Sequence, residues 1–246
     1  MSKTLVLIPS RMSATRLPGK PLLKINNLSI ISHVYKKAQK ADIGEVVVAT
    51  EDQEIFSDII QNGGKAVLTN KNHKTGTDRI FEAFEKLDVQ NIDTILNLQG
   101  DEPNIDVSDI KNLNKMMINN NVEMGTLAAK IKDQSILENE NIVKVIIKNK
   151  LNKENFPLAI NFIRKKKENI DGNLYHHIGI YSYKVKTLKK FVQLKQSNNE
   201  TLNKLEQLRA LDNGIKINVA LAKSSPIGVD TMEDFLAIKK IMEYKS

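Results

Sequence analysis

Short apolar runs, rich in β-branched residues, alternate with stretches of helical spacing along the first half of the chain. The runs at residues 4–8, 45–50, 65–68 and 94–98 predict buried strands. Between them, apolar residues recur three or four positions apart within 28–38, 55–60 and 79–87, which predicts amphipathic helices. The second of these helices ends at Gly63-Gly64, a common C-terminal signal. Helices between strands favour right-handed crossovers, so the sequence predicts a parallel sheet.

The second half of the chain is less regular. Residues 126–131, 142–147, 178–183 and 216–221 predict further strands, and a stripe of leucines predicts an amphipathic helix over 200–211. Thr231 and Asp234 form the capping-box start of a final helix. No repeat or flexible linker separates the halves. We therefore predict one α/β/α domain over residues 1–246, with a segment of about 125–215 that extends the sheet.

The loop after the first strand carries the cations Arg11, Arg16 and Lys20, and its Gly19-Lys20 step lies between two prolines. Open α/β sheets bind their ligands at the carboxyl ends of strands. Arginine forks and a lysine charge there suit a triphosphate. The loop lacks the pattern of a Walker A motif, because Ala14 and Pro21 replace its glycine and hydroxyl residues. A solvated basic loop is the alternative, but the rigid prolines favour a binding site.

Two carboxylates occupy positions where a loop follows a strand or enters a helix. Asp101, in the stretch Gln99-Gly100-Asp101-Glu102-Pro103, suits a hard cation such as Mg²⁺, although a simple turn fits equally well. Asp230 could share that metal, or could merely cap the last helix. A third segment, 74–79, opens a helix with free backbone N–H groups and hydroxyls that suit a phosphate or a base edge.

Composition removes several classes of function. The net charge of +8 could indicate nucleic-acid binding, but the lysines are scattered outside 164–167 and only 5% of residues are aromatic. The chain contains no cysteine, and no apolar run approaches the length of a membrane span. The apolar N-terminal segment is too short for a signal peptide, so we expect a cytoplasmic protein. His176 and His177 have no third histidine at ligand spacing, which disfavours zinc.

What remains is a set of cations, carboxylates and hydroxyls without an evident covalent nucleophile. Neither a Gly-x-Ser-x-Gly elbow nor a dinucleotide-binding fingerprint is present. This inventory favours metal-assisted phosphoryl transfer by positioning and electrostatics.

Motifs along nearly the whole chain resemble the 3-deoxy-manno-octulosonate cytidylyltransferases, the CMP-Kdo synthetases. They are residues 8–21, with the pattern Arg-x₄-Arg-Leu-Pro-Gly-Lys-Pro, and residues 48–50, 75–79, 97–103, 176–181, 205–209 and 228–231. Relatives that activate sialic acid share the first loop. The Gln-Gly-Asp-Glu-Pro, His-x-Gly-x-Tyr and Leu-Glu-Gln-Leu-Arg segments resemble the Kdo enzymes more narrowly.

The resemblance implies a three-layer α/β/α nucleotide-diphospho-sugar transferase fold (Rossmann-like) with a mixed, mainly parallel sheet. It also implies Mg²⁺, a homodimer formed through the 125–215 segment, and transfer of CMP from CTP to Kdo for lipopolysaccharide biosynthesis. The residues implied to bind the nucleotide or act in catalysis are Ser10, Arg11, Lys20, Thr75, Gly76, Thr77, Arg79, Asp101 and Asp230, the last two as metal ligands. Those implied to face the sugar are Gln99, Arg164, His177, Tyr181, Glu206 and Gln207.

One segment departs from the family pattern. Ile163 precedes Arg164 where the family commonly has a hydroxyl residue, and lysines 165–167 replace small residues and a Pro-Trp pair. Activation of a related sugar acid, amino-Kdo or sialic acid, is therefore the nearest alternative. A non-catalytic nucleotide-binding module and an RNA-binding protein are alternatives of other classes. The intact cations and carboxylates argue against the first, and the scarcity of aromatic residues argues against the second.

Overall fold

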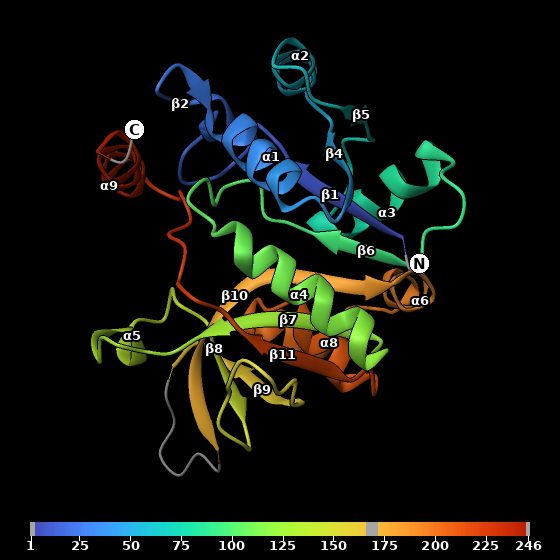
Figure 1. Ribbon diagram of the computed structural model, residues 1–246, viewed down its shortest axis with the longest axis vertical. Helices are drawn as coiled ribbons and strands as arrows, with labels where there is room; N and C mark the ends of the chain where they lie inside the picture. Colours follow the sequence, from blue (N-terminus) through green and yellow to red (C-terminus); the bar gives the residue numbers. More distant parts are fainter. Residues whose placement is uncertain (1–2, 166–171, 245–246) are drawn as a thin grey trace. The chain divides into compact units, whose positions relative to one another are not determined.

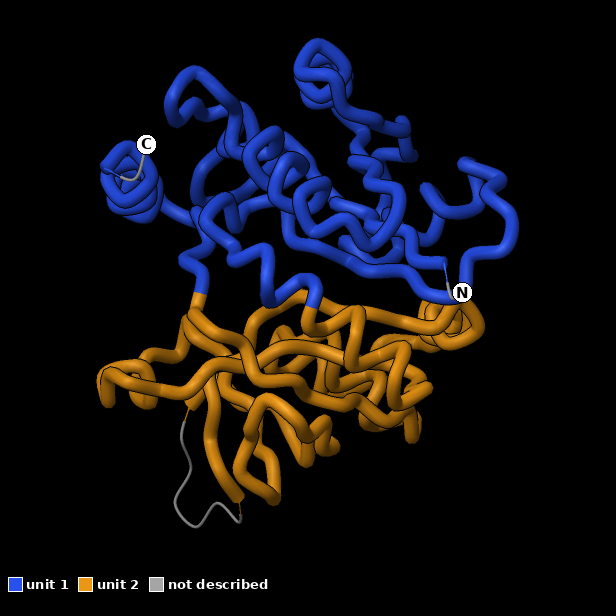
Figure 2. The backbone as a smooth tube through the Cα atoms, viewed as in Figure 1, with its two compact units in different colours: residues 1–111, 226–246 blue, residues 112–225 orange. Residues whose placement is uncertain are grey.

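The computed structural model describes residues 3–165 and 172–244. Its chain divides into two compact units (Figure 2): unit 1 comprises Met1–Lys111 and Pro226–Ser246, and unit 2 is Asn112–Ser225. The segment of about 125–215 that we expected to extend the sheet falls within unit 2. The expectation of one domain over 1–246 stays a prediction.

Unit 1 is built on parallel strands, because a helix separates each strand from the next. Their order is β6 (Thr94–Asn97), β1 (Thr4–Ser10), β4 (Gly44–Thr50) and β5 (Ala66–Leu68). Strands β1 and β6 are almost continuously buried and β4 is buried from Val46 onward, as expected for a sheet covered on both faces, whereas β5 at the edge is only partly buried. Their carboxyl ends therefore meet at one edge, where the loops after β1 and β6 begin.

Helices α1 (Ile30–Ala41) and α2 (Gln53–Gln61) follow β1 and β4, and α3 (Gly76–Leu87) connects β5 back to β6. Right-handed crossovers place α3 on the face opposite α1 (Figure 1). A short hairpin of β2 (Lys24–Ile25) and β3 (Leu28–Ser29) precedes α1. The chain returns to unit 1 at its end as α9 (Met232–Glu243), which shares an apolar cluster with the hairpin and α1: Ile25, Ile30, Val229, Phe235 and Ile238.

Unit 2 has a mixed sheet around the long strand β10 (Asn173–Lys184). Strands β7 (Met124–Ala129) and β8 (Lys144–Ile147) pair with β10 in antiparallel fashion, β9 (Ala159–Ile163) pairs with β8, and β11 (Ile217–Leu221) lies parallel to β7. The pairing of β10 with β7 shifts register between Ile178 and Tyr181, which marks a bulge.

The helices of unit 2 are α5 (Ser135–Glu138), α6 (Val185–Gln193), α7 (Asn198–Asn203) and α8 (Gln207–Asp212), together with most of α4 (Val107–Asn120). Helix α4 approaches β7 closely at Gly125. A Cβ at that glycine would lie 2.7 Å from both Met117 Sδ and Phe156 Cζ. Parallel and mixed pairing with helices on both faces confirms the predicted α/β fold class.

Some local predictions were wrong. The predicted helix over 200–211 is two helices, because Lys204 adopts a left-handed conformation (φ 52°) that ends α7. As a result Leu202, part of the predicted leucine stripe, is 80% exposed. Strand β9 and helices α4 and α6 were not predicted. Among the residues that the structure describes, no helix is long and apolar enough to span a membrane.

Candidate active site

A cavity of about 350 Å³ opens in unit 1 at the carboxyl ends of β1 and β6. It gathers most of the predicted nucleotide and metal residues together with one predicted sugar residue: Ser10, Arg11, Lys20, Thr75, Gly76, Arg79, Gln99, Asp101 and Asp230. Thr77 is 2% exposed within α3 and does not line the cavity. The sheet edge thus brings together motifs that lie up to 220 positions apart in the chain.

The loop after β1 is shaped by backbone hydrogen bonds. Met12 O accepts bonds from Ala14 N and Gly19 N, both at 2.9 Å, and Met12 N donates to Asp52 Oδ2 at 2.7 Å. Gly19 has a φ of 75°, a conformation that favours glycine. It begins the short 3₁₀ helix Lys20–Leu22, where Pro21 supplies the fixed φ. This turn directs the Lys20 side chain into the cavity.

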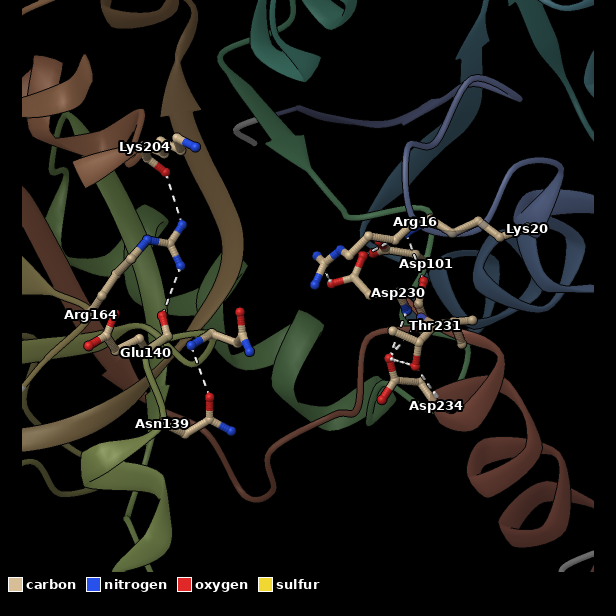
Figure 3. Close-up of polar contacts among 12 residues, drawn as sticks. Arg16, Lys20, Asp101, Asn139, Glu140, Arg164, Lys204, Asp230, Thr231 and Asp234 are labelled. Atoms are coloured by element: carbon tan, nitrogen blue, oxygen red, sulfur yellow. Dashed lines mark hydrogen bonds and ion pairs between the residues drawn. The ribbon is translucent and has the colours of Figure 1, made fainter. Parts of the chain in front are cut away.

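Lys20 joins the two predicted metal carboxylates (Figure 3). Its Nζ donates to Asp101 Oδ2 at 2.7 Å, to Asp230 Oδ1 at 3.0 Å and to Val229 O at 2.7 Å. Burial disfavours the ammonium charge, but the two carboxylates outweigh burial and raise the pKa of Lys20 above its usual value. The lysine is therefore charged at neutral pH, and it shows that this pair of carboxylates holds a cation.

Asp230 is not the cap of the last helix. Thr231 Oγ1 accepts a bond from Asp234 N, and Asp234 accepts from Thr231 N, so Thr231 and Asp234 form the capping box of α9. The Asp230 carboxylate is held instead by Lys20 and by Arg16, whose Nη2 lies 2.7 Å from Asp230 Oδ2. The cap is complete without the Asp230 side chain. The Asp230 carboxylate therefore has no capping role and is available to bind a ligand in the cavity.

The start of α3 forms another wall of the cavity. Thr75 Oγ1 caps the helix by accepting from Asp78 N. Arg79 is 3% exposed and donates to Glu51, Thr69 and Asn70 O. These bonds tie the helix to the segments after β4 and β5, so Arg79 supports this wall by holding protein groups.

The donor set fits Mg²⁺. Carboxylate oxygens are the ligands it prefers, and it usually takes one or two from the protein together with phosphate oxygens and water. Within residues 3–165 and 172–244, no cluster of three or more acidic, histidine or cysteine side chains forms a metal site on its own. Asp101 and Asp230 therefore suit a metal that shares its coordination with a bound phosphate.

Glu102 lies beside these carboxylates and was given no role from the sequence. Its Oε2 atom is buried and has no hydrogen-bond partner among the described residues. Burial raises the pKa of Glu102 to about 8, and the charges of Asp101 and Asp230 add to that effect. A neutral Glu102 limits the negative charge of the cavity to the two carboxylates that face Lys20.

The remaining predicted sugar residues lie in unit 2. His177 and Tyr181 on β10 have ring centroids 5.5 Å apart, and Phe162 packs edge-on against His177 at 4.9 Å. Burial lowers the pKa of His177 to about 3, so its ring is neutral. The Tyr181 hydroxyl is buried and has no hydrogen-bond partner among the described residues. An unsatisfied buried hydroxyl is costly, which points to a polar ligand beside it.

Glu206 and Gln207 follow the turn between α7 and α8. The Glu206 charge contributes to raising the pKa of Tyr181, although burial is the main cause. Gln207 begins α8 and is 7% exposed. A buried ion pair holds the two helices together, since Arg209 donates to both carboxylate oxygens of Glu200, at 2.8 and 2.6 Å. Glu206 thus lies close enough to Tyr181 to act electrostatically on it. The ion pair between Glu200 and Arg209, which flank Glu206 in the chain, anchors its turn.

Arg164 is bound by backbone carbonyls (Figure 3). Its Nε donates to Asn203 O at 2.8 Å, its Nη2 to Lys204 O at 3.1 Å and its Nη1 to Glu140 O at 3.2 Å. The arginine therefore clamps the turn that leads into Glu206, a contact that the sequence did not suggest. Of the predicted lysine run, Lys166 and Lys167 lie outside the described residues.

Two further residues of the cavity were not among the site residues that the resemblance implies. Arg16 was expected, as a loop cation, to suit a triphosphate, and its ion pair with Asp230 follows from the return of the C-terminal segment to unit 1. His73, which hydrogen-bonds Glu82 through Nε2, immediately precedes the 74–79 motif. The position of His73 next to that motif was the signal from which its place in the cavity could have been predicted.

Comparison with known proteins agrees with the motifs. A family model described as Cytidylyltransferase matches residues 5–217. A "3-deoxy-manno-octulosonate cytidylyltransferase" from Afipia carboxidovorans is 44% identical over 240 residues, covering 97% of this chain and 96% of the relative. One from Nitrobacter hamburgensis is 42% identical over 248 residues, covering 98% of this chain and 93% of the relative.

Solved structures are also similar. A structure of "CMP:2-keto-3-deoxy-manno-octonic acid synthetase complexed with CTP" matches with a TM-score of 0.89 and 34% identity, covering 100% of both chains. A cytidylyltransferase from Leptospira borgpetersenii matches with a TM-score of 0.66 at 19% identity, covering 99% of this chain and 88% of the other, which shows the shared fold alone. The resemblance read from the sequence motifs is confirmed.

Proposed function

Because the chain belongs to the cytidylyltransferase family, we propose that it transfers CMP from CTP to the sugar acid Kdo, giving CMP-Kdo and pyrophosphate. The observation that carries this proposal is the pairing of Asp101 with Asp230 around Lys20, inside a cavity that also holds Arg11 and Arg16. Cations beside two carboxylates suit a nucleoside triphosphate with its divalent metal. The relatives that match over nearly their full length bear the name of this activity.

The residues of the cavity have distinct roles in this reaction. Arg11 and Lys20 bind the phosphates, and Ser10 and the start of α3 border the nucleotide. Asp101 and Asp230 would hold Mg²⁺, which when bound neutralises charge on the phosphate oxygens. The anomeric hydroxyl of the sugar attacks the α-phosphorus in line and loses its proton to water, while the bond from the α-phosphorus to the bridging oxygen breaks and pyrophosphate leaves with that oxygen. The protein contributes alignment of the two substrates and a field of fixed charges.

In unit 2 we assign the sugar to the side chains around β10 and α8. Tyr181 offers a buried hydroxyl that has no partner among the residues the structure describes, and Glu206 and Gln207 add acceptors and a donor. Gln99, the remaining residue that the resemblance assigns to the sugar, lines the cavity of unit 1. We further propose that the enzyme acts in the cytoplasm as a homodimer and supplies activated Kdo for lipopolysaccharide.

One experiment tests the reaction and its substrate together. Pyrophosphate release is measured with CTP and Mg²⁺ in the presence of Kdo, amino-Kdo, sialic acid or no sugar. We expect release with Kdo and little without a sugar. Faster release with amino-Kdo or sialic acid would reassign the substrate, and CTP binding without release under any condition would indicate a non-catalytic module.

A further inference from the structure

The hydroxyl of Thr126 fills the bulge in β10. Thr126, on β7, is fully buried, and its Oγ1 lies 2.7 Å from Ile180 O, 3.2 Å from Ile178 O and 3.1 Å from His177 Nε2. The bulge shifts the pairing from Ile178 opposite Leu127 to Tyr181 opposite Thr126, and this shift brings both carbonyls toward one hydroxyl. One oxygen with a single proton therefore contacts two carbonyls and a histidine ring.

The position of that proton follows from the chemistry of the contacts. A carbonyl oxygen can only accept a hydrogen bond, and 2.7 Å is the usual length of an O–H···O bond. The Thr126 proton therefore lies on the contact with Ile180 O. Toward His177 Nε2 the hydroxyl can then only accept, so Nε2 carries the hydrogen.

The other nitrogen of His177 is consequently a hydrogen-bond acceptor. The buried ring is neutral and holds one proton, which Nε2 carries, so Nδ1 presents its lone pair. Within the part of the chain that the structure describes, no hydrogen bond to Nδ1 is formed. The ring lies beside Tyr181, whose buried hydroxyl is likewise without a partner there.

We propose that Thr126 is a positioning residue that holds His177 as the Nε2–H tautomer, so that Nδ1 accepts a hydrogen bond from a hydroxyl of the sugar. The identity of the ligand in this inference rests on the proposed function, whereas the assignment of the tautomer rests only on the contacts of Thr126 with His177 and the two carbonyls. An acceptor at this position pairs with a hydroxyl and repels a carboxylate. His177 therefore reads the polyol part of the sugar acid, and its carboxylate is received by donors elsewhere.

The tautomer can be measured directly on the intact protein without substrate. Long-range ¹H–¹⁵N spectra of protein labelled with ¹⁵N-histidine show which ring nitrogen carries the proton, and a His177→Asn variant assigns the signal. We expect the proton on Nε2 in the wild-type protein and in Thr126→Ser, which keeps the hydroxyl. Thr126→Val removes the acceptor and should move part or all of the population to the Nδ1–H form. A proton on Nδ1 in the wild-type protein overturns the proposal, as does an unchanged spectrum in Thr126→Val.

Kinetics give a second, independent readout. Loss of one neutral hydrogen bond predicts that the KM for Kdo rises roughly 3- to 10-fold in Thr126→Val, with the KM for CTP unchanged. Thr187→Val, which changes another buried threonine of unit 2, should leave both values unaltered. Equal increases for both substrates would overturn the proposal. Absence of turnover with Kdo in the wild-type protein would instead remove the proposed function and leave the tautomer to be judged from the spectra.

Should Thr126→Val fold poorly, the proposal remains testable. Valine leaves the Ile178 and Ile180 carbonyls without the hydroxyl, so a lower melting temperature is expected in any case. The wild-type and Thr126→Ser spectra then decide between the two tautomers on their own.

Discussion

Replacing Lys20 with methionine tests the central charge arrangement of the cavity. The substitution keeps most of the side-chain volume but removes the ammonium that Asp101, Asp230 and Val229 O share. Only 12% of the Lys20 side chain is exposed, so water replaces these contacts poorly. The two carboxylates would then lack the cation they share, and Asp230 would keep only its ion pair with Arg16.

The size of the effect follows from the exposure of the partners. Breaking a fully buried ion pair costs about 3–5 kcal/mol, whereas an exposed pair contributes about 0–1 kcal/mol. Asp101 and Asp230 are 30% and 43% exposed, which lies between these limits. We therefore expect the free energy of unfolding of Lys20→Met to fall by about 2 kcal/mol when no metal is present.

The assay is urea unfolding in EDTA and in millimolar MgCl₂, without nucleotide. In the variant, Mg²⁺ can take the place of the ammonium between the carboxylates and should restore part of the lost stability by mass action. The wild-type protein should gain little, because Lys20 occupies the same oxygens. Lys24→Met, which removes an exposed lysine a few positions away, is the matched control. A Lys20 variant as stable as this control, or an equal effect of Mg²⁺ on all three proteins, would refute the reasoning.

Three further predictions concern the two units. Asp101→Asn and Asp230→Asn should each nearly abolish Mg²⁺-dependent turnover, and the double variant should be no worse than either. The melting temperature of Asp230→Asn should stay near the wild-type value, since Thr231 caps α9. Arg164→Lys cannot keep three bonds to carbonyls, so the KM for Kdo should rise much more than the KM for CTP; equal increases would contradict this. The pKa of His177 is lowered to about 3, so between pH 6.5 and 3 the unfolded chain binds a proton that the folded chain does not. Stability is therefore lost as pH falls through this window, and His177→Asn should lose less in pH-dependent unfolding; parallel curves would count against it.

Most strands of the two units, β9 excepted, were predictable because their signal is local. Runs such as Val46-Val47-Val48 are buried in a two-sided parallel sheet and carry that information in consecutive residues. The helix over 200–211 was predicted wrongly for the opposite reason. Its leucine spacing continues across Lys204, but the pairing of Glu200 with Arg209 is satisfied by two short helices that meet at a turn. Burial of a charge pair thus prevailed over periodicity.

In the candidate site, too, some features could be predicted from the sequence and others could not. The convergence of Asp101 with the loop after β1 follows from the rule that parallel strands end at one edge. The return of Asp230 to that edge was one of two alternatives, and the capping box at Thr231 decides between them. Contacts that depend on exact geometry could not be predicted from the sequence. The clamp of Arg164 on three carbonyls and the place of Thr126 in a bulge both require a register shift or turn conformation that no local pattern encodes.

Unit 1 is discontinuous, and this bears on how the protein matures. The ribosome releases residues 1–111 first and then the whole of unit 2, and only afterwards the segment that contains Val229 and Asp230. Until that segment docks through the apolar cluster of Val229 and Phe235, Lys20 lacks two of its partners and the cavity lacks one carboxylate. A nascent chain that contains all of unit 2 but not yet this segment is therefore still catalytically silent. Activity arises only after α9 has been synthesised and has reached the hairpin made more than two hundred residues earlier.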